Sequence, residues 1–258
     1  MNSYLKRIGI FFYGLLSYAV FLATFVYAIG FVGNLPYAIN TLDGPLQMPL
    51  WHAVLIDVLL LGVFAVQHSV MARPAFKRWW TRYIAVEAER STYVLFSSLA
   101  LILLFVLWQP LGGQVWQIEN PSGRLLMSAI FGFGWALVLY STFLINHFDL
   151  FGLRQVSLQL LGKPYTGLEF KMPAVYKLVR HPLYAGWFLC FWATPSMTWA
   201  HFVFAVLTSL YILIAIRLEE RDLIEMHPEY RDYRRQVPML VPRISRREKA
   251  GADGAEVA

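Results

Sequence analysis

The stretch Ile8–Gly33 reads IGIFFYGLLSYAVFLATFVYAIGFVG and contains no charged side chain. A helix needs about 20 predominantly apolar residues to cross the hydrocarbon core of a bilayer, so this stretch predicts a membrane-spanning helix. Lys6 and Arg7 precede it, as basic residues precede the apolar part of a signal peptide. Such an apolar part has only about 7–15 residues, so we expect the segment to stay in the chain as a span.

Apolar segments of similar length recur along the chain, separated by turns that contain Gly, Pro and Asn. The last one, Pro182–Ile216, is too long for one helix and contains Pro195, which favours a helical hairpin. The pattern predicts an all-α, polytopic membrane bundle with five to six membrane segments, of which the last two form the hairpin. These segments are expected near residues 8–33, 50–72, 91–108, 125–146, 183–194 and 198–216.

The composition agrees with a membrane protein and excludes an ordinary soluble globular protein. Apolar residues make up 58% of the 258 residues and charged residues only 15%, whereas soluble domains have about 45–50% and about 25%, even with glycine counted as apolar. We expect one membrane domain over residues 1–245 and a disordered tail over residues 246–258. The single cysteine, Cys190, cannot form an internal disulfide, and no Cys/His cluster has zinc spacing, so no metal is expected.

The basic residues test the number of crossings, because cytoplasmic loops of membrane proteins collect Lys and Arg. The net charge of +6 would suit either nucleic acid or an anionic lipid surface. Loops 34–49 and 109–123 contain no Lys or Arg, and 21 of the 22 basic residues fall on one side if both termini are cytoplasmic. This distribution predicts cytoplasmic termini, contact with membrane lipids and no nucleic-acid partner.

Two polar residues of the second span are informative, because burying polar groups in lipid is costly unless they have a partner or a task. Asp57 is the only acidic residue within a span, and we interpret it as a packing partner. His68 lies near the cytoplasmic end of the same span. We interpret it either as an interhelical hydrogen-bonding residue or as part of a substrate site.

The densest cluster of functional residue types brackets the predicted hairpin. Arg180–Gly186 (RHPLYAG) precedes it and Arg217–Leu223 (RLEERDL) follows it, so folding of the hairpin brings both motifs together at the cytoplasmic surface. Arginine binds a carboxylate in bidentate fashion, and glutamate offsets a cation, so the pair suits a zwitterionic ligand. The alternative is an ion-pair cluster that anchors the helix ends.

These motifs, together with Tyr230–Pro238 (YRDYRRQVP), resemble the C-terminal signature of the integral-membrane methyltransferases related to isoprenylcysteine carboxyl methyltransferase and the phospholipid methyltransferases. The resemblance covers residues 180–242, and His227-Pro228-Glu229 replaces the usual Phe-Gly before the first Tyr, a departure that concerns the shape of the local loop. It implies a cytoplasm-facing site for S-adenosylmethionine as the methyl donor. The residues to which it assigns this role are Arg180, His181, Tyr184, Gly186, Glu219, Glu220 and Tyr230.

A further segment resembles one branch of these enzymes. Asn146–Gln155 (NHFDLFGLRQ), with His68–Pro74 (HSVMARP) and Glu89–Tyr93 (ERSTY) upstream, is similar to the bacterial methanethiol S-methyltransferases of the nurim-like family. The resemblance implies a multi-pass protein of the bacterial inner membrane that methylates a small volatile thiol, methanethiol, to dimethyl sulfide. The rival hypotheses are a prenylated cysteine or a phospholipid as acceptor, and a non-enzymatic protein like nurim or the NnrU-type proteins, which has no use for S-adenosylmethionine.

Thiol methylation needs the thiolate, and a thiol with a pKa of about 8.5 or higher needs a base or a cation to form it at neutral pH. We expect His147 or Asp149 to accept the proton and Arg154 to supply electrostatic support. On a regular helix His147 and Arg154 share one face, whereas Asp149 joins them only if Gly152 or the helix end breaks the period. The alternative is that this run only caps the fourth span. The residues predicted to contact the acceptor are His68, Asn146 and Gln155.

Overall fold

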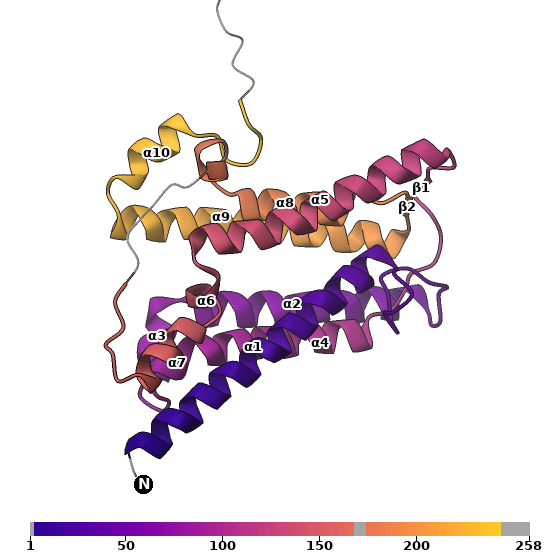
Figure 1. Ribbon diagram of the computed structural model, residues 1–258. Coiled ribbons are helices and arrows are strands. Elements are labelled where there is room, and N and C mark those ends of the chain that lie inside the picture. The colour runs from indigo at the N-terminus through magenta and orange to yellow at the C-terminus, as the bar shows by residue number, and fades with distance from the viewer. Residues whose placement is uncertain (1–2, 168–173, 244–258) are drawn as a thin grey trace, which may run out of the picture.

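The protein is a bundle of long apolar helices (Figure 1). The computed structural model describes residues 3–167 and 174–243. Within those residues, five helices are long and apolar enough to cross a membrane, which confirms the predicted all-α, multi-pass membrane fold. The predicted tail 246–258 lies outside the described residues. The five helices are α1 Ser3–Gly33, α2 Leu50–Ala72, α4 Glu89–Leu107, α5 Pro121–Ile145 and α9 Trp199–Met226.

The helices form two layers around a shared core (Figure 1). Helices α1 and α2 both pack against α4 in one layer, and α5 packs against α8, Pro182–Trp192, in the other layer next to α9. Aromatic residues from both layers belong to one hydrophobic cluster, in which the ring centroids of Phe31 and Phe204 are 6.5 Å apart. Many Leu, Val and Phe side chains remain exposed on the outer faces, as expected of surfaces that contact lipid.

The predicted hairpin is present and joins α8 to α9. Strand β2, Ser196–Met197, lies in its turn and pairs antiparallel with β1, Trp116–Gln117. This short pairing fixes the tip of the hairpin to the segment that precedes α5. The second leg continues to Met226 instead of ending near residue 216, because its last turns carry exposed charged side chains that need no lipid around them.

Helices α5 and α8 approach closely at two glycines. A Cβ atom added to Gly186 would lie 2.9 Å from the carbonyl oxygen of Gly134 and 2.8 Å from a methyl carbon of Val138. Small residues let backbones approach in this way in membrane helices. The sequence predicts a donor-binding role for Gly186, and the structure places it against α5. Gly186 therefore determines how closely α8, which carries the first donor motif, packs against α5.

Short helices gather at the end of the bundle where α1 begins and α9 ends (Figure 1). The lengths of the apolar segments in the sequence predict none of these short helices. Helix α5 ends one residue earlier than predicted, because Asn146 has a φ angle of 137°, which is incompatible with a helix. The short elements are α3 Pro74–Trp80, α6 His147–Leu150, α7 Leu153–Leu160, α10 Tyr230–Gln236 and the single 3-10 turns η1 Val86–Ala88 and η2 Ala174–Lys177.

Candidate functional site

A buried carboxylate joins the two motifs that bracket the hairpin. Glu220 lies on α9 and is 4% exposed. Its Oε1 accepts a hydrogen bond from Arg180 Nε at 2.8 Å and lies 3.0 Å from His181 Nε2, and its Oε2 lies 3.1 Å from Arg234 Nε. We call Glu220 and these three partners the Glu220 clasp. The predicted proximity of the two motifs is confirmed, whereas their role in donor binding stays a prediction.

The C-terminal segment closes over the clasp. The backbone amide of Arg180 donates to the carbonyl oxygen of Pro238 at 2.8 Å. The Tyr230 hydroxyl donates to Glu220 Oε1 at 3.5 Å, and burial raises the pKa of this phenol above its usual range. Tyr230 therefore stays protonated and can donate to the carboxylate at any physiological pH. The third part of the sequence signature thus supports the clasp from outside the hairpin.

Glu219 differs from its neighbour Glu220 in exposure. Glu219 is exposed, and its Oε2 accepts a hydrogen bond from the Tyr184 hydroxyl at 2.9 Å. The buried Glu220 is already paired with two arginines, which leaves little of its negative charge for a ligand. The sequence assigns both carboxylates alike, but the structure makes Glu219 the one that is open to a bound cation or hydroxyl group.

A second polar cluster lies between α2 and α4 at the same end of the bundle. His68 Nε2 is 2.8 Å and His68 Nδ1 is 3.1 Å from the Tyr93 hydroxyl, and Nδ1 is also 3.2 Å from Ser97 Oγ. The Phe64 ring stacks on the imidazole with centroids 5.2 Å apart. His68 therefore does form the interhelical hydrogen bonds that its sequence context indicates, while its role toward a substrate stays a prediction.

The His68 cluster adjoins the donor motif through tyrosines. Ser69 Oγ on α2 lies 3.0 Å from the Tyr211 hydroxyl on α9. Tyr93 and Tyr184 both lie close enough to Tyr211 and Glu219 to interact with them electrostatically, and also to each other. Polar groups of α2, α4, α8 and α9 therefore converge beside Glu219.

The α6–α7 corner, residues 146–155, is the segment that the sequence predicts as catalytic. Asn146 Oδ1 caps α6 by accepting a bond from the Asp149 amide at 3.1 Å, and Gly152, with φ 87°, separates α6 from α7. This break lets Asp149 Oδ1 pair with the Arg154 guanidinium at 2.9 Å. The same guanidinium donates to the carbonyl oxygen of Thr166 at 2.9 Å. The interruption required for Asp149 to meet Arg154 is thus present.

The imidazole of His147 is enclosed and is bonded to residues other than this ion pair. Its Nδ1 lies 2.8 Å from Thr142 Oγ1, which itself donates to the carbonyl oxygen of Leu139, so Nδ1 carries the hydrogen and Nε2 accepts from the Tyr18 hydroxyl at 2.9 Å. The Phe143 ring stacks on the imidazole with centroids 4.3 Å apart. Only 3% of His147 is exposed, and burial lowers the pKa of its imidazole. His147 and Arg154, predicted to share a face, do not meet, because the helix breaks between them.

Comparison with known proteins identifies the family. The chain is 58% identical over 247 residues to a methanethiol S-methyltransferase of Crocosphaera subtropica, which covers 95% of this chain and 96% of that protein. The chain belongs to the methanethiol S-methyltransferase family. A methanethiol S-methyltransferase of Mycobacterium tuberculosis is 52% identical over 239 residues, or 92% of this chain and 98% of the relative. The predicted family, and with it a methyltransferase enzyme, is confirmed.

The chain is also similar to nurim, a protein from a mammal. Nurim of Rattus norvegicus is 32% identical over 176 residues, which is 65% of this chain and 66% of that protein. This similarity agrees with the predicted nurim-like branch and with a multi-pass membrane protein. Neither a family model nor a solved structure matches the chain.

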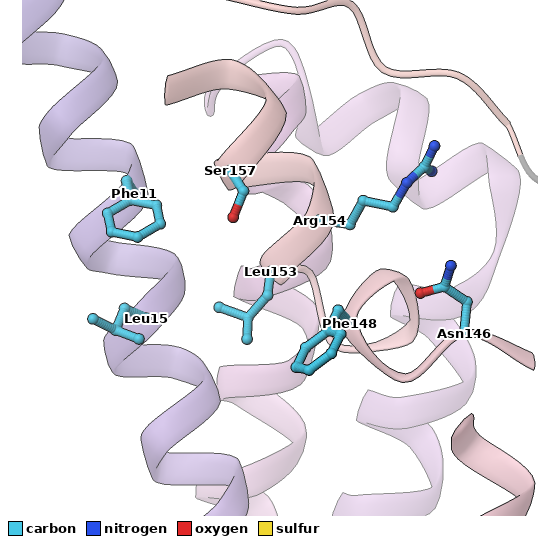
Figure 2. Close-up of a pocket in the computed structure, with 7 residues that line it drawn as sticks. All are labelled: Phe11, Leu15, Asn146, Phe148, Leu153, Arg154 and Ser157. Atoms are coloured by element: carbon cyan, nitrogen blue, oxygen red, sulfur yellow. The ribbon is translucent and has the colours of Figure 1, made fainter. Parts of the chain in front are cut away.

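In this member of the methanethiol S-methyltransferase family, a pocket of about 560 Å³ opens between α1 and the α6–α7 corner (Figure 2). Two predicted residues, Asn146 and Arg154, lie at it, but the Arg154 side chain points away from α1 (Figure 2). Gln155 instead donates to the carbonyl oxygen of Asp149 at 3.1 Å and so braces the corner. The lining residues are Phe11, Leu15, Asn146, Phe148, Leu153, Arg154 and Ser157.

The sequence does not single out two residues of the polar cluster around His68. Tyr93 stands within the ERSTY segment that carries the resemblance, but only the fold shows its hydroxyl beside His68. Tyr211 stands in a long apolar run, where a tyrosine is typical of a membrane-interface belt and gives no functional signal. Among residues 3–167 and 174–243, no group of three or more His, Cys, Asp or Glu is placed to hold a metal ion.

Proposed function

We propose that this chain transfers the methyl group of S-adenosylmethionine to methanethiol and releases dimethyl sulfide. The observation that carries the proposal is the convergence of the exposed Glu219–Tyr184 pair with the buried Glu220 clasp at one end of the hairpin. The chain that contains this arrangement is 58% identical over 95% of its length to a methanethiol S-methyltransferase. The proposal therefore rests on a site geometry and on an independently measured relationship.

We place the protein in a bacterial inner membrane with both termini in the cytoplasm and with residues 1–245 acting as one domain. The start of α1 and helix α10 lie at the same end of the bundle (Figure 1). Nearly all Lys and Arg residues belong to this end if the termini are cytoplasmic, and such residues favour the cytoplasmic side. The donor, which is charged, would then reach Glu219 from the cytoplasm.

The residues near Glu219 fit the chemistry of S-adenosylmethionine. An exposed carboxylate suits its ammonium group or ribose hydroxyls, and the Tyr184 ring suits its adenine or its sulfonium. A carboxylate held tightly against the sulfonium would stabilise the ground state more than the transition state, because the positive charge disappears during transfer. We therefore assign Glu219 and Tyr184 to direct contact. The residues that hold them in place are Arg180, His181, Gly186, Glu220 and Tyr230.

The acceptor side must supply a thiolate in line with the methyl group, which is an orientation and deprotonation task. The residues that the sequence predicts for this task are His147, Asp149 and Arg154 of the α6–α7 corner, with His68, Asn146 and Gln155 as acceptor contacts. In the structure Arg154 is already paired with Asp149, and both His147 nitrogens are bonded to hydroxyl groups. The corner residues are therefore already paired and can hold the acceptor in position. His68 is the alternative candidate for removing the proton of the thiol.

Headspace analysis of membranes that contain the protein tests this function. With S-adenosylmethionine and methanethiol we expect dimethyl sulfide above the level of control membranes. A headspace at the control level, with methylation of a prenylcysteine or a phospholipid amine, would overturn the assignment of the acceptor.

Donor binding by the purified protein tests the site. Glu219→Gln should weaken the affinity for S-adenosylmethionine about 10-fold, because it removes a charged hydrogen-bond acceptor. The matched control is Glu225→Gln on the same helix, where the exposed carboxylate pairs with Arg221 at 3.3 Å. Calorimetry should give an unchanged Kd for the control. Equal affinities for wild type and Glu219→Gln would show that the donor binds elsewhere.

A further inference from the structure

His68 lies on the interior face of α2 and is only partly buried. Around α2 it lies about 20° from the buried Asp57 and Leu61, and about 160–200° from the exposed Val66 and Val70. It is nevertheless only half-buried. Its ring therefore lies among the contacts between helices, and part of its surface stays accessible.

The imidazole is held in one orientation by its partners. Nδ1 lies 3.2 Å from Ser97 Oγ, so a hydrogen on Nδ1 leaves the lone pair of Nε2 to accept from the Tyr93 hydroxyl at 2.8 Å. Gln67 Nε2 donates to the same Ser97 oxygen at 3.3 Å. The arrangement holds the ring in place, and with the hydrogen on Nδ1 it leaves Nε2 to take up a proton from Tyr93.

A cation and the donor motif flank the Tyr93 hydroxyl. The Arg90 guanidinium lies over the Tyr93 ring, 5.1 Å from its centroid, and favours negative charge nearby. On the other side, Tyr93 lies within electrostatic range of Glu219 and Tyr211, and Tyr184 lies within range of Tyr93. The Tyr93 hydroxyl therefore contacts His68, and Tyr93 lies near the residues to which we assign the donor.

We infer that Tyr93 and His68 form the proton relay that converts the acceptor thiol into a thiolate, an inference that rests on the proposed function. The thiol proton moves to Tyr93 Oη while the phenol proton moves to His68 Nε2, so that the imidazole becomes a cation. The thiolate sulfur forms a bond to the methyl carbon as the sulfonium carbon–sulfur bond breaks, and the electron pair stays on the departing thioether sulfur. His68 then releases its proton to water.

In this assignment Tyr93 is the catalytic residue that touches the thiol, and His68 acts behind it. Arg90 stabilises the thiolate that forms but disfavours the positive charge on His68, and Glu219, as an anion, acts against the thiolate. The relay would let the reaction run below the pKa of the free thiol. The charged and titratable groups that face the relay are Arg90 and Glu89 from α4, Tyr211 and Glu219 from α9 and Tyr184 from α8.

Two tyrosine variants provide a matched test, because each tyrosine donates to a histidine. Tyr93→Phe removes one oxygen and keeps the ring, and it should lower kcat for methanethiol about 100-fold or more, the size typical of lost acid–base catalysis. Its Kd for S-adenosylmethionine, measured by calorimetry, should equal that of wild type. Tyr18→Phe, which removes the hydroxyl beside His147, should keep kcat within about 2-fold of wild type. His68→Gln should reproduce the loss seen in Tyr93→Phe.

A more acidic thiol separates proton removal from other roles. With 2,2,2-trifluoroethanethiol, which is already ionised to a large extent, the loss in Tyr93→Phe should shrink to about 10-fold or less, and its pH–rate profile should follow the ionisation of the free thiol. The same loss with both thiols would overturn the relay, as would a loss confined to Tyr18→Phe. A wild-type protein that forms no thioether from either thiol would instead refute the proposed function itself.

Discussion

His68 and His147 have almost the same set of partners but very different surroundings. Each imidazole is bonded to a tyrosine hydroxyl and to a serine or threonine hydroxyl, and each is stacked on a phenylalanine ring. His147 is 3% exposed, whereas His68 is half-buried. Access, and not hydrogen bonding, distinguishes the two sites. We therefore expect the enclosed His147 to orient the chain and the more accessible His68 to exchange a proton.

The residues around the two histidines also differ in chemical character. His147 packs among the rings of Phe143, Phe148 and Phe151, whereas the His68 cluster is flanked by Arg90 and adjoins Glu219. Charged groups beside a reacting centre can stabilise charge that develops there, while aromatic rings mainly contribute packing. The comparison predicts that changes near His147 act on stability and that changes near His68 act on turnover.

The largest effect on stability is expected at the break between α6 and α7. Gly152 has φ 87°, and a Cβ atom there would lie 2.6 Å from Ser91 Oγ and 2.8 Å from Ser91 N. Gly152→Ala should therefore lower the free energy of unfolding by about 3 kcal/mol, from backbone strain and overpacking together. Thermal unfolding of the detergent-purified protein measures this loss. A Gly152→Ala protein as stable as wild type would mean that the corner is not the rigid element that the comparison requires.

Gly62→Ala is the matched control for that experiment. Gly62 lies in the middle of α2, and a Cβ atom there would meet nothing within 4 Å. Alanine favours a helix over glycine by about 1 kcal/mol, so the midpoint of unfolding should stay the same or rise.

A smaller effect is expected from the ion pair of the corner. Arg154 and Asp149 have side chains that are 25% and 16% exposed, and the guanidinium also bonds to Thr166. Arg154→Gln should lower the free energy of unfolding by about 1–2 kcal/mol, since it leaves Asp149 without its cation. The control, Arg221→Gln, breaks a pair with 75% and 64% exposure and should change stability by less than about 0.5 kcal/mol. If Arg154→Gln kept its stability but lost its turnover, the corner would be catalytic and the comparison would fail.

Most of the fold could be predicted from the sequence, because the bilayer imposes a minimum length and an apolar composition on each span. The five long helices and the hairpin at Pro195 follow from this rule. The extension of α9 to Met226 and the short helices do not, because they lie outside the lipid, where length and hydropathy carry no constraint. Their ends are set instead by single residues, such as the positive φ of Asn146.

The candidate site could be predicted only in part. The hairpin predicts that Arg180 and Glu220 meet, and they do, at 2.8 Å. The sequence cannot tell the exposed Glu219 from the buried Glu220, because adjacent residues on a helix point about 100° apart and only the packing decides which one faces inward. For the same reason the sequence cannot show that the imidazole of His147 is enclosed, and its catalytic role stays a prediction.

The smallest expected effect is a change in how stability depends on pH. Burial lowers the pKa of His147 in the folded protein below the value of about 6.5 that a histidine has in the unfolded chain. The unfolded state therefore binds more protons as the pH falls below about 6.5, so the contribution of neutral His147 to stability is fully present above that pH and is lost as the pH falls through the folded pKa. His147→Gln keeps a donor and an acceptor but cannot titrate, so its melting temperature should fall less steeply between about pH 7.5 and 5.5 than that of wild type. Identical slopes for His147→Gln and wild type would show that His147 is not held neutral by burial, and the distinction drawn between the two histidines would then lose its physical basis.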